Sequence, residues 1–138
     1  MPSSYLIDVA NGVIYARKWG VLTDEHVAAY TKALWTDPRF NPGFRQIVDF
    51  REVTTLRVTG GTVRGVARGN PVRRDARRAF VVASDEAFGL SRMFGTFTDS
   101  NAETFTIVRT LEAAFEWIGM EPTASWPTQQ PDATFGVP

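Results

Sequence analysis

Cysteine is absent from this chain of 138 residues, so disulfides, thiol nucleophiles and cysteine-ligated metals are excluded. Long hydrophobic runs are absent too, because no apolar stretch approaches the ~20 residues that a membrane-spanning helix needs. The first four residues lack the basic and apolar regions of a signal peptide. These absences lead us to expect a cytoplasmic protein.

Signatures of catalysis are scarce as well. His26 is the only histidine, and no second histidine stands at a metal-binding spacing, so we expect a surface side chain. No serine has the context of a nucleophile elbow, and the glycines at positions 60, 61, 65 and 69 match neither a P-loop nor a dinucleotide-binding fingerprint. An enzyme would have to use Asp49, Asp85 or Thr59 without a histidine partner. We therefore predict a non-enzymatic protein with no catalytic residue, no metal and no cofactor.

Charge is balanced overall but unevenly distributed. Residues 51–78 carry eight arginines and two acids, whereas residues 79–138 carry two arginines and eight acids. A basic middle suits an acidic partner, a phosphate or a membrane surface, but a solvated helix face neutralised by the acidic half is the favoured interpretation. No aromatic residue occurs from position 51 to 79, so bases have nothing to stack on and nucleic-acid binding is not expected.

Composition predicts one domain with an ordinary core. The apolar fraction is 43% and the charged fraction 22%, both typical of globular proteins. Residues 1–120 should form this domain. Residues 121–138 contain four prolines and little periodicity, which predicts an extended or disordered tail, with Trp126 and Phe135 as side chains able to dock on the body.

Two runs of strand-forming residues near the N-terminus, separated by a turn signal, predict a β-hairpin. The runs 4–9 and 13–19 are rich in strand formers, and Asn11-Gly12 between them tolerates the positive φ angles of a type I′ turn. In the second run, residues 13, 15, 17 and 19 share one face, and Ile14, Ala16 and Lys18 share the other. Gly20 is expected to end this strand.

Alternating helix and strand signals follow the hairpin. Four residues are expected to cap the N-termini of helices: Thr23, Thr59, Ser84 and Thr110. Three further runs are predicted to be strands: residues 46–50, 78–83 and 105–109. The second helix, residues 60–70, is weakened by its glycines. The element order ββαβαβαβα predicts an α/β fold: a mixed five-stranded sheet with about four helices.

These elements resemble the STAS fold of anti-sigma-factor antagonists, and more closely the SpoIIAA-like group of small bacterial proteins. The resemblance covers roughly residues 4–119 and rests on the order and spacing of four short motifs: Gly20-Val-Leu-Thr-Asp-Glu, Asp37-Pro-Arg-Phe, Ile47-Val-Asp-Phe and Phe88-Gly-Leu-Ser-Arg-Met. The SpoIIAA-like group is also akin in structure to the CRAL-TRIO lipid-binding domains.

The resemblance implies a regulatory site at the start of the second helix. In anti-sigma-factor antagonists an Asp-Ser-Ser-Gly motif stands there, and a partner kinase phosphorylates one serine. Here residues 57–60 occupy that motif: Thr59 matches the phosphorylated serine, while Arg57 replaces the aspartate and Val58 the first serine. The alternative, which we favour, is that Thr59 is a plain N-cap.

Two functions follow from this sequence. The first is a protein-interaction module whose partner is a protein such as an anti-sigma-factor-like kinase; the candidate phosphoacceptor or ligand residue is Thr59, and the candidate partner- or anion-binding residues are Arg57, Gly60, Gly61, Arg64 and Arg92. The second is a small carrier or sensor that binds a lipid or other apolar small molecule between helices and sheet. A pocket of several hundred Å3 would favour the carrier and a filled core the module. A homodimer is a further hypothesis.

Overall fold

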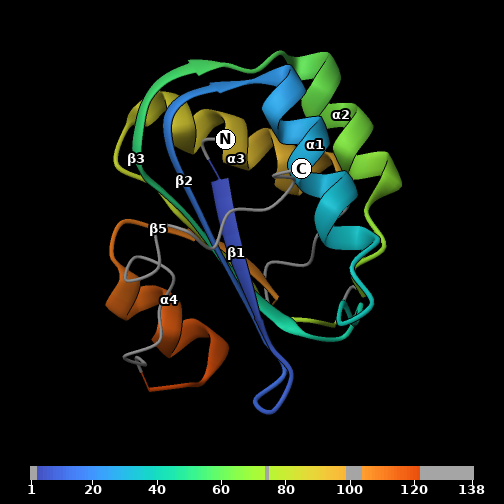
Figure 1. Ribbon diagram of the computed structural model, residues 1–138. Helices are drawn as coiled ribbons and strands as arrows, with labels where there is room; N and C mark the ends of the chain where they lie inside the picture. Colours follow the sequence, from blue (N-terminus) through green and yellow to red (C-terminus); the bar gives the residue numbers. More distant parts are fainter. Residues whose placement is uncertain (1–2, 74, 99–103, 122–138) are drawn as a thin grey trace.

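A five-stranded sheet forms the middle of the computed structural model, which describes residues 3–73, 75–98 and 104–121 (Figure 1). Its strands lie side by side in chain order: β1 (Ser3–Asp8), β2 (Val13–Thr23), β3 (Arg45–Arg57), β4 (Arg78–Val81) and β5 (Phe105–Val108). β1 pairs antiparallel with β2, and the remaining neighbours pair in parallel. The predicted mixed sheet and element order are confirmed.

Four helices occur in the described part of the chain, and all four begin at the predicted caps. They are α1 (Asp24–Trp35), α2 (Gly60–Gly69), α3 (Asp85–Phe97) and α4 (Leu111–Ile118). Each preceding Thr or Ser side chain accepts a hydrogen bond from a backbone N–H three residues later, which satisfies one of the free donors at the helix start. α4 ends at Gly119, whose φ of 77° is the left-handed conformation of a helix C-cap.

The sheet separates two layers of packing. Figure 1 shows α4 on one side of the sheet and α1 and α2 on the other. Tyr15 and Ile47 pack with Phe115 of α4, whereas the alternate strand residues Ile14 and Val48 belong to the core cluster under α1. This alternation places Lys18 on the face covered by α1, α2 and α3.

The N-terminal hairpin is confirmed, with a longer turn than a two-residue type I′ connection. Asp8 pairs with Val13, so the turn spans residues 9–12 and Val9 lies outside the strand. Gly12 has a φ of 65°, and the Asp8 carboxylate accepts hydrogen bonds from the backbone and side chain of Asn11 at 3.1 and 2.8 Å.

The length of β2 and β3 corrects the sequence prediction. Gly20 does not end β2, and residues 51–57 are strand rather than a connection, because Trp19–Thr23 pair with Glu52–Arg57. The register shifts after Arg17 and after Gly20, where φ is 66°, so the strand bends and continues instead of stopping. Both strands therefore run on beyond their neighbours and curve over the upper part of the molecule (Figure 1).

The predicted tail lies outside the described residues from position 122 onward, together with Trp126 and Phe135. Within the described ranges, no helix has the length and apolar character that crossing a membrane requires.

Gly20 provides a test of this bend. Gly20→Ala should destabilise the protein by about 1–2 kcal/mol, because alanine resists a left-handed conformation although its Cβ would meet no atom within 4 Å. Gly65→Ala is the matched control: it is also open around the new Cβ but helical, so it should stabilise by up to about 1 kcal/mol. Urea unfolding of both variants measures the difference, and equal effects would contradict the assignment.

Candidate ligand-binding site

A cavity lies between the sheet and the three helices α1, α2 and α3. The cavity itself has a volume of about 120 Å3. The atom-free space around it, which includes solvent at the open mouth, is about 840 Å3. The cavity walls are mainly aliphatic and aromatic; they include Leu22, Leu34, Val48, Leu56, Val66 and Phe94.

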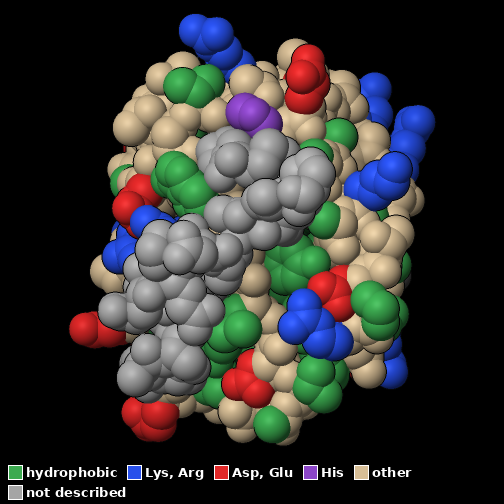
Figure 2. Space-filling model, in the orientation of Figure 1, with side chains coloured by type: hydrophobic (Ala, Val, Ile, Leu, Met, Phe, Trp, Pro, Cys, Tyr) green, Lys and Arg blue, Asp and Glu red, His purple; other side chains and the backbone are tan. Residues whose placement is uncertain are grey.

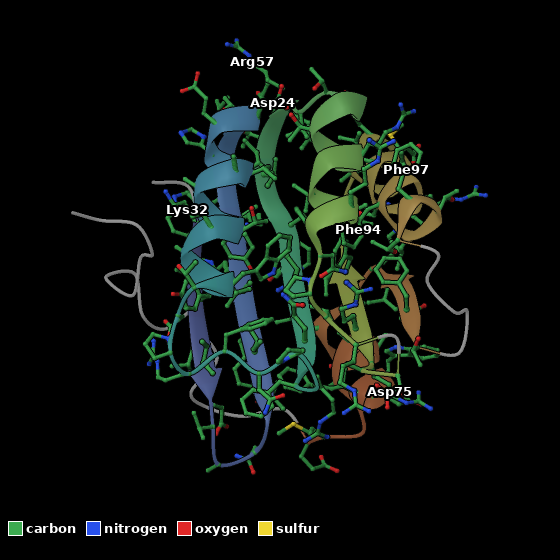
Figure 3. The ribbon with its side chains drawn as sticks, turned by 90° about the vertical axis from the view of Figure 1, so that its right-hand side faces the viewer. Asp24, Lys32, Arg57, Asp75, Phe94 and Phe97 are labelled. Carbon is green, nitrogen blue, oxygen red and sulfur yellow. The ribbon has the colours of Figure 1, made fainter. Side chains whose placement is uncertain are left out.

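The bent ends of β2 and β3 create one end of this cavity. Leu22 and Leu56 lie on the extension of the two strands, and Val58 follows directly in the loop before α2. α2 then closes over the space with a narrow apolar face, in which Val63 is 7% exposed and Val66 is half-buried. Figure 3 looks onto these helices and shows α1 and α2 side by side in front of the sheet.

An apolar stripe along α3 is part of the cavity wall. Ala87, Leu90 and Phe94 line it, and the buried Ser91 adds a hydroxyl. Phe97, at the end of the same stripe, lies outside the lining and packs under the Arg64 guanidinium at 4.9 Å. The stripe therefore borders the cavity, while Phe94 also packs against Phe80 and Phe105.

Lys18 is the most unusual group in the cavity. The residue is only 3% exposed. Its Nζ lies 3.3 Å from Ser3 Oγ and 3.0 Å from the centroid of the Tyr30 ring. Burial lowers the pKa of this ammonium well below its ordinary value. Among the described residues, no carboxylate lies within ion-pair distance of it.

Further polar side chains line the same space. Arg78, at the start of β4, is 6% exposed, and its guanidinium lies 5.4 and 5.6 Å from the Phe94 and Phe105 rings. Burial lowers the pKa of Arg78 to about 10. Burial also raises the pKa of Tyr30, against a hydrogen bond with Gln46 that lowers it. The charged residues among those lining the cavity are thus both basic.

Thr59 occupies the N-cap position that the sequence predicts. Its Oγ1 accepts a hydrogen bond from the Thr62 N–H at 3.3 Å, and its backbone N–H and hydroxyl donate to the Asp24 carboxylate at 2.8 and 3.0 Å. The backbone N–H of Thr59 is the main cause of a lowered pKa at Asp24. Thr59 therefore joins the N-terminal ends of α1 and α2.

The other predicted site residues do not converge on Thr59. Gly60 and Gly61 follow it in the first turn of α2, but Arg57 projects away into solvent above Asp24 (Figure 3). Arg64 stacks on Phe97, and Arg92 is exposed on α3. Figure 2 shows basic side chains at the edge where α2 lies, consistent with a solvated helix face.

Neither Asp49 nor His26 lines the cavity. Asp49 is 1% exposed, accepts a hydrogen bond from the Arg51 N–H at 3.0 Å and pairs with the Arg51 guanidinium at 2.9 Å. His26 reaches the surface, where its ring is visible in Figure 2. In the described residues, no group of three or more His, Asp or Glu side chains is arranged to hold a metal ion.

Comparison with known proteins adds one informative likeness. No protein-family model matches the chain, and no curated protein sequence matches it significantly. A solved structure, an uncharacterized protein of the DUF3478 family from Shewanella loihica PV-4 described as having a SpoIIAA-like fold, superposes with a TM-score of 0.56. The two chains are 17% identical, and the match covers 84% of this chain and 93% of the other.

This chain has a SpoIIAA-like fold. The fold resemblance expected from the four sequence motifs is confirmed, while identity at this level shows the fold alone. On the SpoIIAA-like framework, Thr59 stands at the start of α2 and the cavity lies directly behind that helix.

Lys18 is the site residue that sequence reasoning passed over. The available signal was its place after Ile14 and Ala16 on one strand face, since a cation on an apolar face is unexpected. Nothing in the sequence indicated that α1 would cover that face with Tyr30 and leave space beside it.

Removal of the buried charge should stabilise the protein. Lys18→Met should raise the free energy of unfolding at neutral pH, because methionine fills similar space without a desolvation cost. The pKa of Lys18 is lower in the folded than in the unfolded protein, so the unfolded chain binds more protons. The free energy of unfolding of the wild type therefore rises with pH, by at most about 1.4 kcal/mol per pH unit. This rise ends near pH 10.4, where the lysine of the unfolded chain also loses its proton. The gap between variant and wild type should therefore narrow as pH rises. Chemical unfolding at several pH values measures it, with exposed Lys32→Met as control; a constant gap would contradict the buried charge.

The cap at α2 is tested separately. Thr59→Ala should destabilise by about 1 kcal/mol, because it removes both the acceptor for the Thr62 N–H and the hydroxyl that donates to Asp24. Thr59→Ser should remain close to wild type. Thr59→Asp keeps a capping oxygen but faces the Asp24 carboxylate, so it should be less stable than the serine variant above pH 5. Thermal unfolding of the three variants gives the order, and an unaffected alanine variant would be inconsistent with the cap.

Proposed function

We propose that this protein binds a small, largely apolar ligand in the cavity between the sheet and helices α1, α2 and α3, as a carrier or sensor. The observation that carries the proposal is the open, mostly apolar cavity, whose lining buries Lys18. Its volume of about 120 Å3 is smaller than the several hundred Å3 expected of a carrier pocket, so the proposal rests on the lining and the open mouth and not on size. Protein interiors are normally packed as densely as organic crystals, so a space of this size is unusual inside a small domain.

The energetics favour an occupant. A ligand with apolar surface recovers dispersion contacts and removes its own surface from water at the same time.

The helix over the cavity supports ligand entry. α2 has ten residues, four of them glycine, and glycine weakens a helix by up to about 1 kcal/mol per interior position. At Gly65 a new Cβ would meet no atom within 4 Å, so packing does not account for that glycine. A helix of low intrinsic stability can move away from the sheet at modest cost.

The protein-interaction module remains a second proposal with less support. A phosphate on Thr59 would meet the Asp24 carboxylate, and no contact with Arg57 or Arg64 stands ready to receive it among the described residues. Phosphorylation would instead break the link between α1 and α2, the two helices that cover the cavity. An anti-sigma-factor-like kinase, another protein partner and a homodimer remain hypotheses.

The non-enzymatic interpretation also belongs to this proposal. The residues lining the cavity include no aspartate, glutamate or histidine, which are the usual groups for proton transfer. We assign the described lining the role of holding a molecule and Lys18 the role of a binding residue.

Occupation of the cavity is measured by native mass spectrometry of protein purified from a bacterial host, followed by denaturing extraction of bound molecules. We expect a co-purifying apolar compound, and an increase in melting temperature when the stripped protein is reloaded. Ala87→Phe should abolish both effects, because Ala87 is 5% exposed and lines the cavity.

Ala28→Phe is the matched control. Ala28 lies exposed on α1 outside the cavity, so this variant should bind like wild type. A wild-type protein that neither carries nor takes up any apolar compound would refute the proposal. Ala87→Leu provides a milder filling variant should the phenylalanine variant not fold.

A further inference from the structure

We propose that the ligand is an aliphatic monocarboxylate, whose chain fills the apolar cavity and whose carboxylate pairs with the Lys18 ammonium. This inference rests on the proposed function and specifies the chemistry of its ligand. It is carried by the contact set of Lys18 together with the charge of the cavity lining.

The first step is the missing counter-charge of Lys18. Lysine is almost never fully buried unless it is paired, because transfer of an ammonium out of water is costly. Within the described residues, the contacts of Lys18 Nζ are the Ser3 hydroxyl and the face of the Tyr30 ring. Neither of these neutralises a full positive charge. A bound carboxylate would complete the ion pair at the one place where the cavity has an unbalanced cation.

The second step is the sign of the whole lining. Lys18 and Arg78 are its two charged residues, and both are more than nine-tenths buried. In a low-dielectric space beside the Lys18 ammonium, anions are favoured over cations, because the desolvation cost of a bound ion is offset there only for a negative charge.

The third step is the choice of a carboxylate over a phosphate. Lys18 is a single point charge, flanked by a hydroxyl and an aromatic ring, and the walls nearby are apolar. One ammonium balances a monoanion. A phosphate monoester carries between one and a half and two charges and three strong acceptor oxygens near neutral pH, so it would leave charge unpaired in an apolar space.

The test compares two ligands of equal chain length. Decanoate and decanol are titrated into the stripped full-length protein by calorimetry, with wild type, Lys18→Met and Lys32→Met. We expect decanoate to bind wild type at least tenfold more tightly than decanol. Lys18→Met should lose at least tenfold in decanoate affinity while it keeps decanol binding, because the apolar walls are intact.

Lys32→Met is the matched control, since Lys32 is the other lysine of the chain and points into solvent from α1 (Figure 3). It removes the same charge from the protein and should leave both affinities unchanged. Decyl phosphate is the competing head group, and its tighter binding than decanoate would overturn the assignment of a carboxylate.

The outcomes separate this inference from the proposed function. Equal binding of decanoate and decanol, unaffected by Lys18→Met, would overturn the role of Lys18 and leave an apolar-ligand protein. Binding of neither compound, in a protein that also purifies without a ligand, would overturn both proposals. A loss of decanoate binding in Lys32→Met equal to that in Lys18→Met would reduce the effect to net charge and overturn the inference.

Discussion

The parallel pairing of β2 with β3 is the constraint on which the rest of this molecule depends. The two strands stay paired from Val13 to Thr23 and from Arg45 to Arg57, far beyond the ends of β4 and β5. The shared bend near Gly20 carries both strands over the helical side. Because α1 follows β2 at once and α2 follows β3 after two residues, this bend sets where both helices start and how much room remains beneath them.

Stability and binding oppose each other in the space so formed. A filled core with an apolar residue at position 18 would stabilise the empty domain, because neither a cavity cost nor a desolvated ammonium would remain. The protein instead keeps Lys18 under Tyr30 and leaves volume beside it. Binding sites commonly carry such local destabilisation, since a site that is satisfied without its ligand has little to gain from binding.

The contact between Thr59 and Asp24 lies where the proposed ligand site and the proposed interaction site meet. It joins the starts of α1 and α2 at the end of the cavity formed by Leu22 and Leu56. A modification or partner that acts at Thr59 would therefore change the closure of the cavity as well as the surface. A regulatory site at Thr59 and a ligand site in the cavity could therefore both be present, because they lie next to each other. Each requires its own test. The SpoIIAA-like fold does not decide between the two proposals, because a fold by itself does not determine function.

Local chemistry in the sequence was enough to predict the element order, the hairpin and all four helix caps, because each depends on residues within a few positions of one another. The N-cap role of Thr59 followed for the same reason, whereas Arg57, Arg64 and Arg92, which were predicted to share a partner-binding surface with it, do not converge on it. The tertiary structure alone decided that strand continues past Gly20, since pairing with a distant strand overrides a local stop signal. It alone also decided that Lys18 is buried beside a cavity, because burial depends on which helix covers a strand face and how closely it packs.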